Sequence, residues 1–291
     1  MSLPTLLPLV AAIIYASGAL LVKRAADLGV GVWRTAFVAN IVGALVFQPL
    51  LLLGGTIHPH LWWQPAIVGL CFTVGQWFTF TAMDKGDVSL ATPVLGLKIL
   101  FVAGLVTLFG GQTLRPALWV AALLATLGIV LLNRRGEHMA HHHIGRTIAM
   151  SGLAAFAFAI FDVLVQKWAP AWGTGRFVPL AMGAAGLFSF AFVPRFRAPL
   201  SAISGQTWAW LLAGTITMAA QSVMFVSTIS QWGNAASANV VYSSRGLWSV
   251  VLVWLVGHWV KSREQHLGRS IIAWRLGGAT LMLSAICMVA L

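Results

Sequence analysis

Ten apolar runs, each about as long as a lipid bilayer is thick, alternate with short polar links along this chain. A membrane-spanning helix needs about 20 apolar residues. Trp residues recur near the ends of these runs, where interfacial aromatic belts are expected. The predicted spans are Leu3–Val22, Trp33–Leu53, Trp62–Met83, Ser89–Phe109, Pro116–Leu132, Thr147–Trp168, Phe177–Val193, Thr207–Ser227, Ala235–Val256 and Ile271–Leu291.

The last five spans repeat the pattern of the first five. A shift of 147 residues aligns the fourth span with the ninth and pairs Gly86 with Gly233, and a shift of 143 residues pairs Gly43 with Gly186. Because five is an odd number, the second half must enter the membrane the other way up. We therefore predict an all-α membrane protein made of two inverted five-helix repeats, an architecture found in secondary transporters. The predicted repeats are residues 1–146 and 147–291.

Composition supports the membrane location and limits the partners. Only 8% of the residues are charged and 59% are hydrophobic, whereas a soluble domain is about 25% charged. The formal net charge of +12 would suggest nucleic acid in a soluble protein. Here nearly every basic residue stands in a link between apolar runs, as topology signals do. We therefore predict a lipid bilayer and a small-molecule substrate as partners, and no nucleic acid.

Basic residues also predict the orientation. Thirteen of the 18 Lys and Arg residues lie in the links that join an odd-numbered span to the next span, or in the first turns of the span that follows. The links and span ends on the other side carry only Arg115, Lys167 and Arg176. Since basic links stay in the cytoplasm, we predict a multi-pass protein of the cell (inner) membrane with both termini outside the cytoplasm.

The stretch from Lys85 to Asn133, which includes LATPVLGLKILFVAGLVTLFGGQTLRPALW, resembles the end of an EamA repeat. Gly111–Pro116 followed by Trp119 matches the short link of that repeat, with Gln112 in place of the usual acid, and Lys261–Arg269 resembles an enlarged second copy. The chain is thus similar to ten-helix EamA-type members of the drug/metabolite transporter superfamily. Members of this family usually keep both termini in the cytoplasm, so the basic links here imply the opposite orientation.

Two cations lie at equivalent positions inside the membrane. Lys98 is near the middle of the fourth span, and Arg245 follows it by 147 residues in the ninth. A charge at that depth costs about 2.5–3.5 kcal/mol on insertion scales, so it usually faces a cavity or a partner. Two like charges repel unless an anion lies between them. We interpret the pair as a site for an organic anion; the alternative is that each base snorkels or pairs with an acid such as Asp162.

The phosphate-sugar and nucleotide-sugar translocators of the same superfamily are similar in this respect. They place a Lys in the fourth helix and Lys or Arg in the ninth around the anionic group of the substrate. The resemblance implies the same roles for Lys98 and Arg245, without identifying the substrate.

Other polar residues are candidates for lining the same cavity. Tyr242 and Asn239 share a helix face with Arg245 because they precede it by three and six residues. On other spans the candidates are Gln221, Gln76 and Thr92. Hydrogen bonding between helices, which membrane bundles use widely, is the alternative role for each of them.

Asp162 is the one acid clearly within a predicted span. It is a candidate for proton coupling, and it loosely resembles the acid in the first helix of small multidrug pumps. Alternatively, it forms an ion pair with Arg245 or Lys167. Pro93 and Gly96, just before Lys98, are candidates for loosening the fourth helix and freeing backbone carbonyls near the site. Ordinary helix packing is the alternative role for both.

The leading function is secondary active transport of a small anionic or zwitterionic metabolite by alternating access. The rivals are a multidrug or hydrophobic-solute exporter of the same superfamily and a membrane-embedded enzyme acting on a lipid phosphate. The chain has no GxxxxGK[ST] motif for ATP. His138 and His141–His143 lack the helical spacing of metal ligands. We expect no enzyme activity, cofactor or metal, and a monomer, with a dimer as the alternative.

Overall fold

Helices make up every regular element of the described chain. The structure is a computed structural model and describes residues 2–85, 88–109, 114–132, 144–256 and 269–290. The α-helices are α1 (Leu3–Asp27), α2 (Val32–Val46), α3 (Trp63–Lys85), α4 (Val88–Leu95), α5 (Lys98–Phe109), α6 (Pro116–Leu132), α7 (Ile144–Trp172), α8 (Thr174–Phe188), α9 (Gly205–Trp232), α10 (Ala235–Tyr242), α11 (Arg245–Val256) and α12 (Arg269–Ala290). Short 3-10 helices cover Gln48–Leu53, Pro59–Leu61, Ser189–Arg195 and Leu200–Ala202.

These helices confirm the predicted spans. Within the described residues, seven helical stretches are long and apolar enough to cross a membrane, and the shorter apolar helices Pro116–Leu132 and Leu276–Ala290 match the fifth and tenth spans. The ninth span is formed by α10 and α11 in tandem. Some helices continue past the predicted ends; α1 reaches Asp27 and α7 reaches Trp172. Apolar runs mark the part of a helix inside the lipid, and a helix can continue beyond it.

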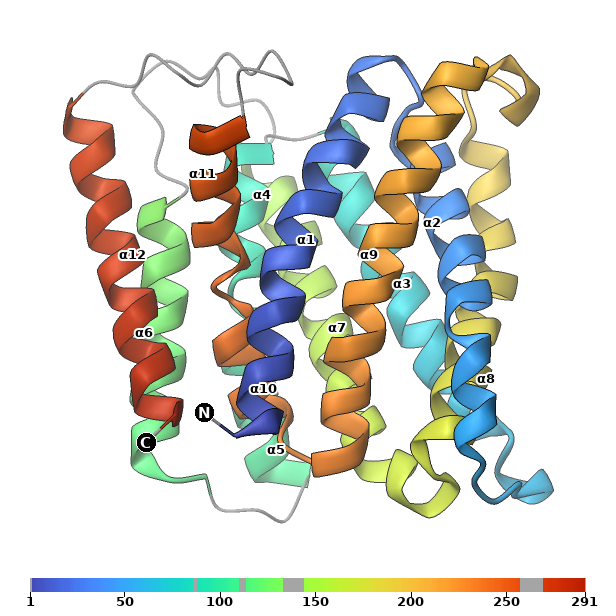
Figure 1. Ribbon diagram of the computed structural model, residues 1–291, viewed down its shortest axis with the longest axis horizontal. Coiled ribbons are helices and arrows are strands. Elements are labelled where there is room, and N and C mark those ends of the chain that lie inside the picture. The colour runs from blue at the N-terminus through green and yellow to red at the C-terminus, as the bar shows by residue number, and fades with distance from the viewer. Residues whose placement is uncertain (1, 86–87, 110–113, 133–143, 257–268, 291) are drawn as a thin grey trace.

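The halves pack on one another reciprocally. Helix α1 lies along α9 and α3 along α7, so the first helix of each half contacts the third helix of the other half. The fifth helices, α6 and α12, also lie side by side (Figure 1). Both termini lie at the same end of the bundle (Figure 1), as an even number of spans requires. This reciprocity is the packing expected of inverted repeats related by a pseudo-two-fold axis.

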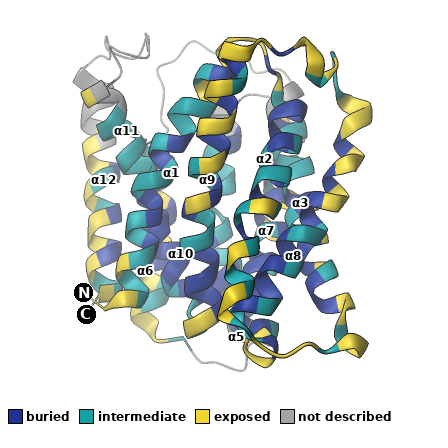
Figure 2. Ribbon diagram, turned by 45° about the vertical axis from the view of Figure 1, so that its right-hand side comes forward, coloured by how far each residue is buried: buried dark blue, intermediate teal, exposed yellow. Residues whose placement is uncertain are grey.

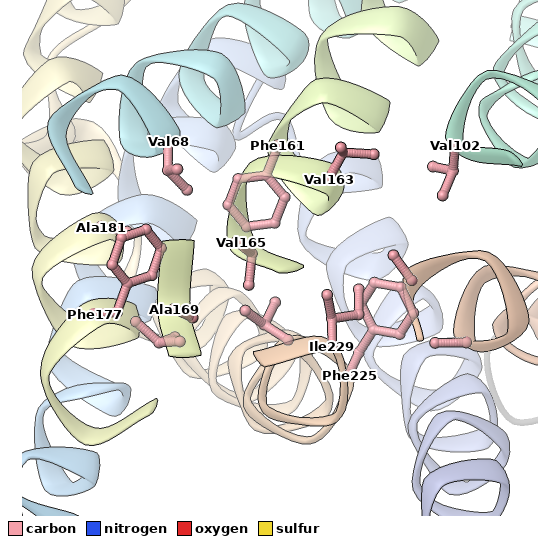
Figure 3. Packing of buried hydrophobic residues seen from close by; sticks show 14 of the residues in the cluster. Val68, Val102, Phe161, Val163, Val165, Ala169, Phe177, Ala181, Phe225 and Ile229 are labelled. Carbon is pink, nitrogen blue, oxygen red and sulfur yellow. The ribbon is translucent and has the colours of Figure 1, made fainter. Parts of the chain in front are cut away.

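The outside of the bundle is apolar. Leu52, Leu108 and Leu187 are 91%, 76% and 71% exposed, and exposed residues follow the outward faces of the helices (Figure 2). Soluble monomers rarely expose large contiguous apolar patches, so these faces contact lipid. Inside, a large buried cluster joins both halves, with side chains such as Val102 of α5, Phe161 of α7 and Phe225 of α9 (Figure 3).

Glycines set the closest approach between halves. At the α6–α12 contact, a Cβ on Gly128 would lie 2.9 Å from the carbonyl oxygen of Gly278. Conversely, a Cβ on Gly278 would lie 2.7 Å from the carbonyl oxygen of Gly128. Two helices that touch through their backbones gain dispersion contacts, which drive helix association in lipid.

The fourth and ninth spans are both broken near their middle. Helix α4 ends at Leu95 and α5 begins at Lys98, and α10 ends at Tyr242 and α11 begins at Arg245. The two breaks are therefore equivalent positions of the two repeats. Broken helices inside a membrane are tolerated where the irregular backbone is buried in protein or lines a cavity.

The breaks have different local causes. In the fourth span, Pro93 disfavours regular helix, and the amide of Gly96 donates to the carbonyl oxygen of Pro93 over 3.0 Å. The prediction that this segment would loosen is confirmed. In the ninth span, the Ser243 hydroxyl donates to the carbonyl oxygen of Val240 over 2.6 Å. Serine side chains compete with the helix ladder in this way. The break in the ninth span was not predicted.

Candidate functional site

Each intramembrane cation is the first residue of the helix that follows a break. Lys98 begins α5 and Arg245 begins α11. A helix N-terminus carries the positive end of the helix dipole, so a cation is unfavourable there and an anion is favourable. Both positions therefore need negative charge nearby.

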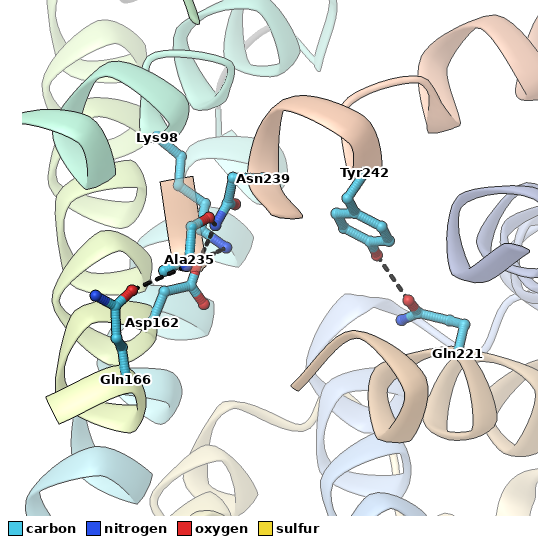
Figure 4. A network of polar contacts seen from close by, with 7 residues as sticks. All are labelled: Lys98, Asp162, Gln166, Gln221, Ala235, Asn239 and Tyr242. Carbon is cyan, nitrogen blue, oxygen red and sulfur yellow. Dashed lines mark hydrogen bonds and ion pairs between the residues drawn. The ribbon is translucent and has the colours of Figure 1, made fainter. Parts of the chain in front are cut away.

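Asp162 supplies that charge to Lys98. The Lys98 Nζ lies 2.7 Å from Asp162 Oδ2, and the side chains are 15% and 0% exposed. The pair joins α5 of the first half to α7 of the second (Figure 4). Asp162 thus pairs with Lys98, which was one of the alternatives from the sequence, rather than with Arg245 or Lys167.

Asn239 of α10 completes this polar cluster. Its Nδ2 donates to Asp162 Oδ2 over 2.6 Å and to the carbonyl oxygen of Ala235 over 2.9 Å. Nearby on α7, Gln166 Oε1 accepts from the Ala235 amide over 2.8 Å, which holds the start of α10. The other carboxylate oxygen, Asp162 Oδ1, is buried without a hydrogen-bond partner among the described residues. The cluster therefore has an unused acceptor.

Arg245 has a different environment. Its guanidinium carbon lies 5.0 Å from the ring centre of Tyr15 on α1 and 4.6 Å from that of Tyr242 on α10. These contacts are within cation–π range. The one ion pair found among the described residues is that of Lys98, so no described carboxylate neutralises Arg245. Aromatic rings hold this cation and leave its charge without a counterion in the part of the chain that the structure describes.

Stacked rings connect the two cations. Lys98 Nζ lies 5.3 Å from the ring centre of Phe225 on α9. The Phe225 ring in turn stacks on Tyr242 with centres 4.3 Å apart, and Tyr242 contacts Arg245. The two repeat-equivalent cations thus flank one aromatic stack.

The other residues predicted to line the cavity are only partly found near Lys98 and Arg245. Tyr242 donates its hydroxyl to Gln221 Oε1 over 2.8 Å, and both side chains are buried. Gln76 instead accepts from Asn40 Nδ2 over 2.6 Å, in a contact between α3 and α2. Thr92 lies on α4 one turn before the break, where its carbonyl oxygen accepts from the Gly96 amide. The contacts described above join Tyr242, Asn239 and Gln221 to the site but not Gln76.

Sequence reasoning missed Tyr15, Phe225 and Gln166. One signal was available, because the chain contains two tyrosines in all and both contact Arg245. Phe225 and Gln166 stand in spans with many similar residues, and nothing in their spacing distinguishes them.

Several predicted features lie outside the described residues. They are His138, His141–His143, the Gly111–Thr113 part of the short link, and the 261–268 part of its second copy. Within the described ranges, no three His, Cys, Asp or Glu side chains gather as metal ligands would.

Comparison with known proteins gives a family and a fold. A family model described as the EamA-like transporter family matches residues 3–134. A solved structure described only as "Crystal structure of protein" superimposes with a TM-score of 0.74 at 20% identity, over 96% of this chain and 95% of that chain. At that identity the likeness concerns the fold alone. No curated protein gives a significant match.

Proposed function

We propose that this chain, whose residues 3–134 match the EamA-like transporter family of the drug/metabolite transporter superfamily, is a secondary active transporter of a small anionic or zwitterionic solute. The observation that carries this proposal is Arg245, a cation at a break in the ninth span with no carboxylate partner among the described residues. Broken helices whose N-termini face anionic groups are typical substrate sites in such transporters.

The ion pair between Lys98 and Asp162 supports transport by alternating access. It joins a helix of the first half to a helix of the second, beside the helix breaks where rigid segments can pivot. When one half moves against the other, the surroundings of Lys98 and Asp162 change. The proposed protonation of Asp162 is therefore coupled to the opening of the substrate site. Rocking of inverted halves around a central site is the common mechanism of such folds.

Transport itself is tested in vesicles containing the purified protein and preloaded with unlabelled amino acids, organic acids or sugar phosphates. We expect at least one labelled anion to accumulate by exchange with its unlabelled form, and the accumulation to vanish when the vesicles are made leaky. An anion that is chemically converted without being accumulated would instead support the membrane-embedded enzyme.

Asp162 is the proposed proton-coupling group. Its Oδ1 has no partner among the described residues, so this oxygen is available to receive a proton. We expect the folded fraction of Asp162→Asn to lose the dependence of transport on a pH gradient while it keeps exchange of the solute. The variant should also be less stable than the wild type, because Lys98 loses its counterion. Uptake is measured in the same vesicles with and without the gradient. Proton-driven uptake that persists in a well-folded Asp162→Asn variant would contradict the coupling role.

The proposed orientation in the cell (inner) membrane places both termini outside the cytoplasm. The basis is the excess of basic residues in the links at the end opposite the termini. Some of these residues also have structural contacts; Arg34, for example, donates to the carbonyl oxygen of Gly29 over 2.8 Å. We expect a reporter that works only outside the cytoplasm to be active when it is fused after Leu291. If a fluorescent protein, which is fluorescent only in the cytoplasm, is fluorescent when fused at that terminus, the proposed orientation is wrong.

A further inference from the structure

A cavity of about 230 Å³ lies between α1 and α11 on one side and α12 on the other. Helix α11 packs against α1, whereas α12 packs against α6 (Figure 1). The cavity therefore separates two pairs of packed helices. Its wall includes Leu9 of α1, Ser244 just before α11, Leu247 and Trp248 of α11, and Leu283 and Cys287 of α12.

The wall of this cavity is apolar. The described residues that line it expose no polar atom to it, and the hydroxyl of Ser244 and the indole nitrogen of Trp248 are buried among protein atoms. A buried water molecule needs about two to four polar partners, whereas an apolar cavity of about 150 Å³ stays dry and binds apolar molecules. An occupant of this cavity is therefore an apolar group.

The cavity is continuous with the outer surface of the bundle, which contacts lipid. Leu283 is 52% exposed and Cys287 is also exposed, so two residues of the wall belong to the outer face of α12 as well. The apolar groups that surround this face in a membrane are the acyl chains of phospholipids. An acyl chain can thus enter the cavity from the bilayer without crossing water.

Packing favours an acyl chain over an empty cavity. Lipid tails are as apolar as leucine side chains, so the hydrophobic effect does not drive a chain from the bilayer into the cavity. An empty cavity, however, leaves its wall without van der Waals partners, and a chain that occupies it restores those contacts. Van der Waals packing is also what associates helices in lipid.

We infer that this cavity binds an acyl chain of a bilayer phospholipid, which packs against the first turn of α11. The inference goes beyond the proposed function and does not depend on the binding of an anion by Arg245. It assigns the site to the lipid's chain and not to its headgroup, because the wall offers no polar atom.

A bound chain should stabilise the break in the ninth span. Ser244 lies in the break and Trp248 lies one turn later, and the Trp248 amide donates to the carbonyl oxygen of Ser244 over 3.1 Å. A ligand that binds the closed form makes local opening of such bonds rarer. The described wall of the cavity does not include the equivalent break in the fourth span, residues 95–98, which is therefore an internal control.

Hydrogen exchange of the purified full-length protein tests the inference. The protein is kept in a steroid-based detergent, which brings no alkyl chain of its own, and receives dihexanoyl or dimyristoyl phosphatidylcholine. The break lies near the middle of its span, about 15 Å from the headgroups, so only the longer chain can reach it. We expect the dimyristoyl lipid to slow exchange of the amides of residues 244–248 at least about threefold relative to the dihexanoyl lipid, and to change residues 95–98 less than about twofold.

Two variants reduce the cavity from opposite walls. Leu247→Trp and Leu9→Phe each place a larger side chain in it, and either variant should lose the protection that the dimyristoyl lipid gives to residues 244–248. Leu127→Trp is the matched control, because Leu127 is 53% exposed on α6 and does not belong to the described wall of the cavity. It should respond to the lipid like the wild type.

The headgroup provides the last comparison. Dimyristoyl phosphatidylglycerol should protect residues 244–248 as strongly as the phosphatidylcholine, because the wall contributes no charge. Protection that requires phosphatidylglycerol would assign the effect to basic side chains and overturn the inference. Equal protection by both chain lengths, equal protection of both breaks, or wild-type protection in both cavity-reducing variants would overturn it as well.

Discussion

Replacement of Lys98 by methionine is expected to lower the free energy of unfolding by about 3–5 kcal/mol, the usual effect of removing one partner of a buried ion pair. Asp162 is 0% exposed, so the variant leaves a buried carboxylate without its counterion. The double variant Lys98→Met with Asp162→Asn removes both charges and should recover most of the loss. Thermal unfolding in detergent measures these differences.

Lys167→Met is the matched control for this experiment. Lys167 lies on α7 five residues from Asp162, and its side chain is exposed. A surface substitution of this kind usually changes stability by less than about 0.5 kcal/mol. Wild-type stability in Lys98→Met, or a double variant no more stable than the single one, would show that the ion pair does not stabilise the fold.

Replacement of Arg245 by glutamine should have the opposite pattern, with near-normal folding and a large loss of substrate affinity. No described carboxylate is left unpaired when this cation is removed. A hydrogen bond to a charged group contributes about 1.5–3 kcal/mol, so the dissociation constant should rise from about tenfold to over a hundredfold. Arg245→Lys should also weaken binding, because an ammonium cannot reproduce the planar donor fork.

Binding and unfolding are measured on the same preparations. Arg146→Gln provides the control, since Arg146 is exposed near the start of α7. It should match the wild type in both measurements. Severe unfolding of Arg245→Gln without a specific loss of affinity in the folded fraction would favour a structural role for Arg245.

The spacing of apolar runs and of repeated residues along the sequence was sufficient to predict much of the fold and part of the site. The apolar runs predicted the spans, and the 147-residue repeat placed Lys98 and Arg245 at equivalent positions. In the structure both begin a helix after a break. Repeat spacing determines depth in the membrane, because each residue of a helix advances a fixed distance along its axis.

Contacts between helices were harder to predict, because they depend on how each helix is rotated. The sequence alone favoured one shared anion site for Lys98 and Arg245, so neutral variants at both positions were expected to behave alike. The pairing of Lys98 with Asp162 changes that expectation for Lys98. Gln76 and Gln221 occupy similar places in the two repeats, yet their partners differ; one bonds Asn40 and the other Tyr242. The repeats share a backbone pattern and have diverged in side-chain contacts.

The central claim is that Arg245 binds the anionic group of the transported solute. The most direct test is the thermal stabilisation of wild-type and Arg245→Gln protein by one panel of organic anions. A ligand at 100 times its dissociation constant stabilises the folded state by about 2.7 kcal/mol. We expect at least one anion to raise the melting temperature of the wild type in a saturable way and to leave Arg245→Gln unchanged at the same concentration. Equal stabilisation of both proteins by every active anion, or no stabilisation of the wild type by any anion, would contradict the account.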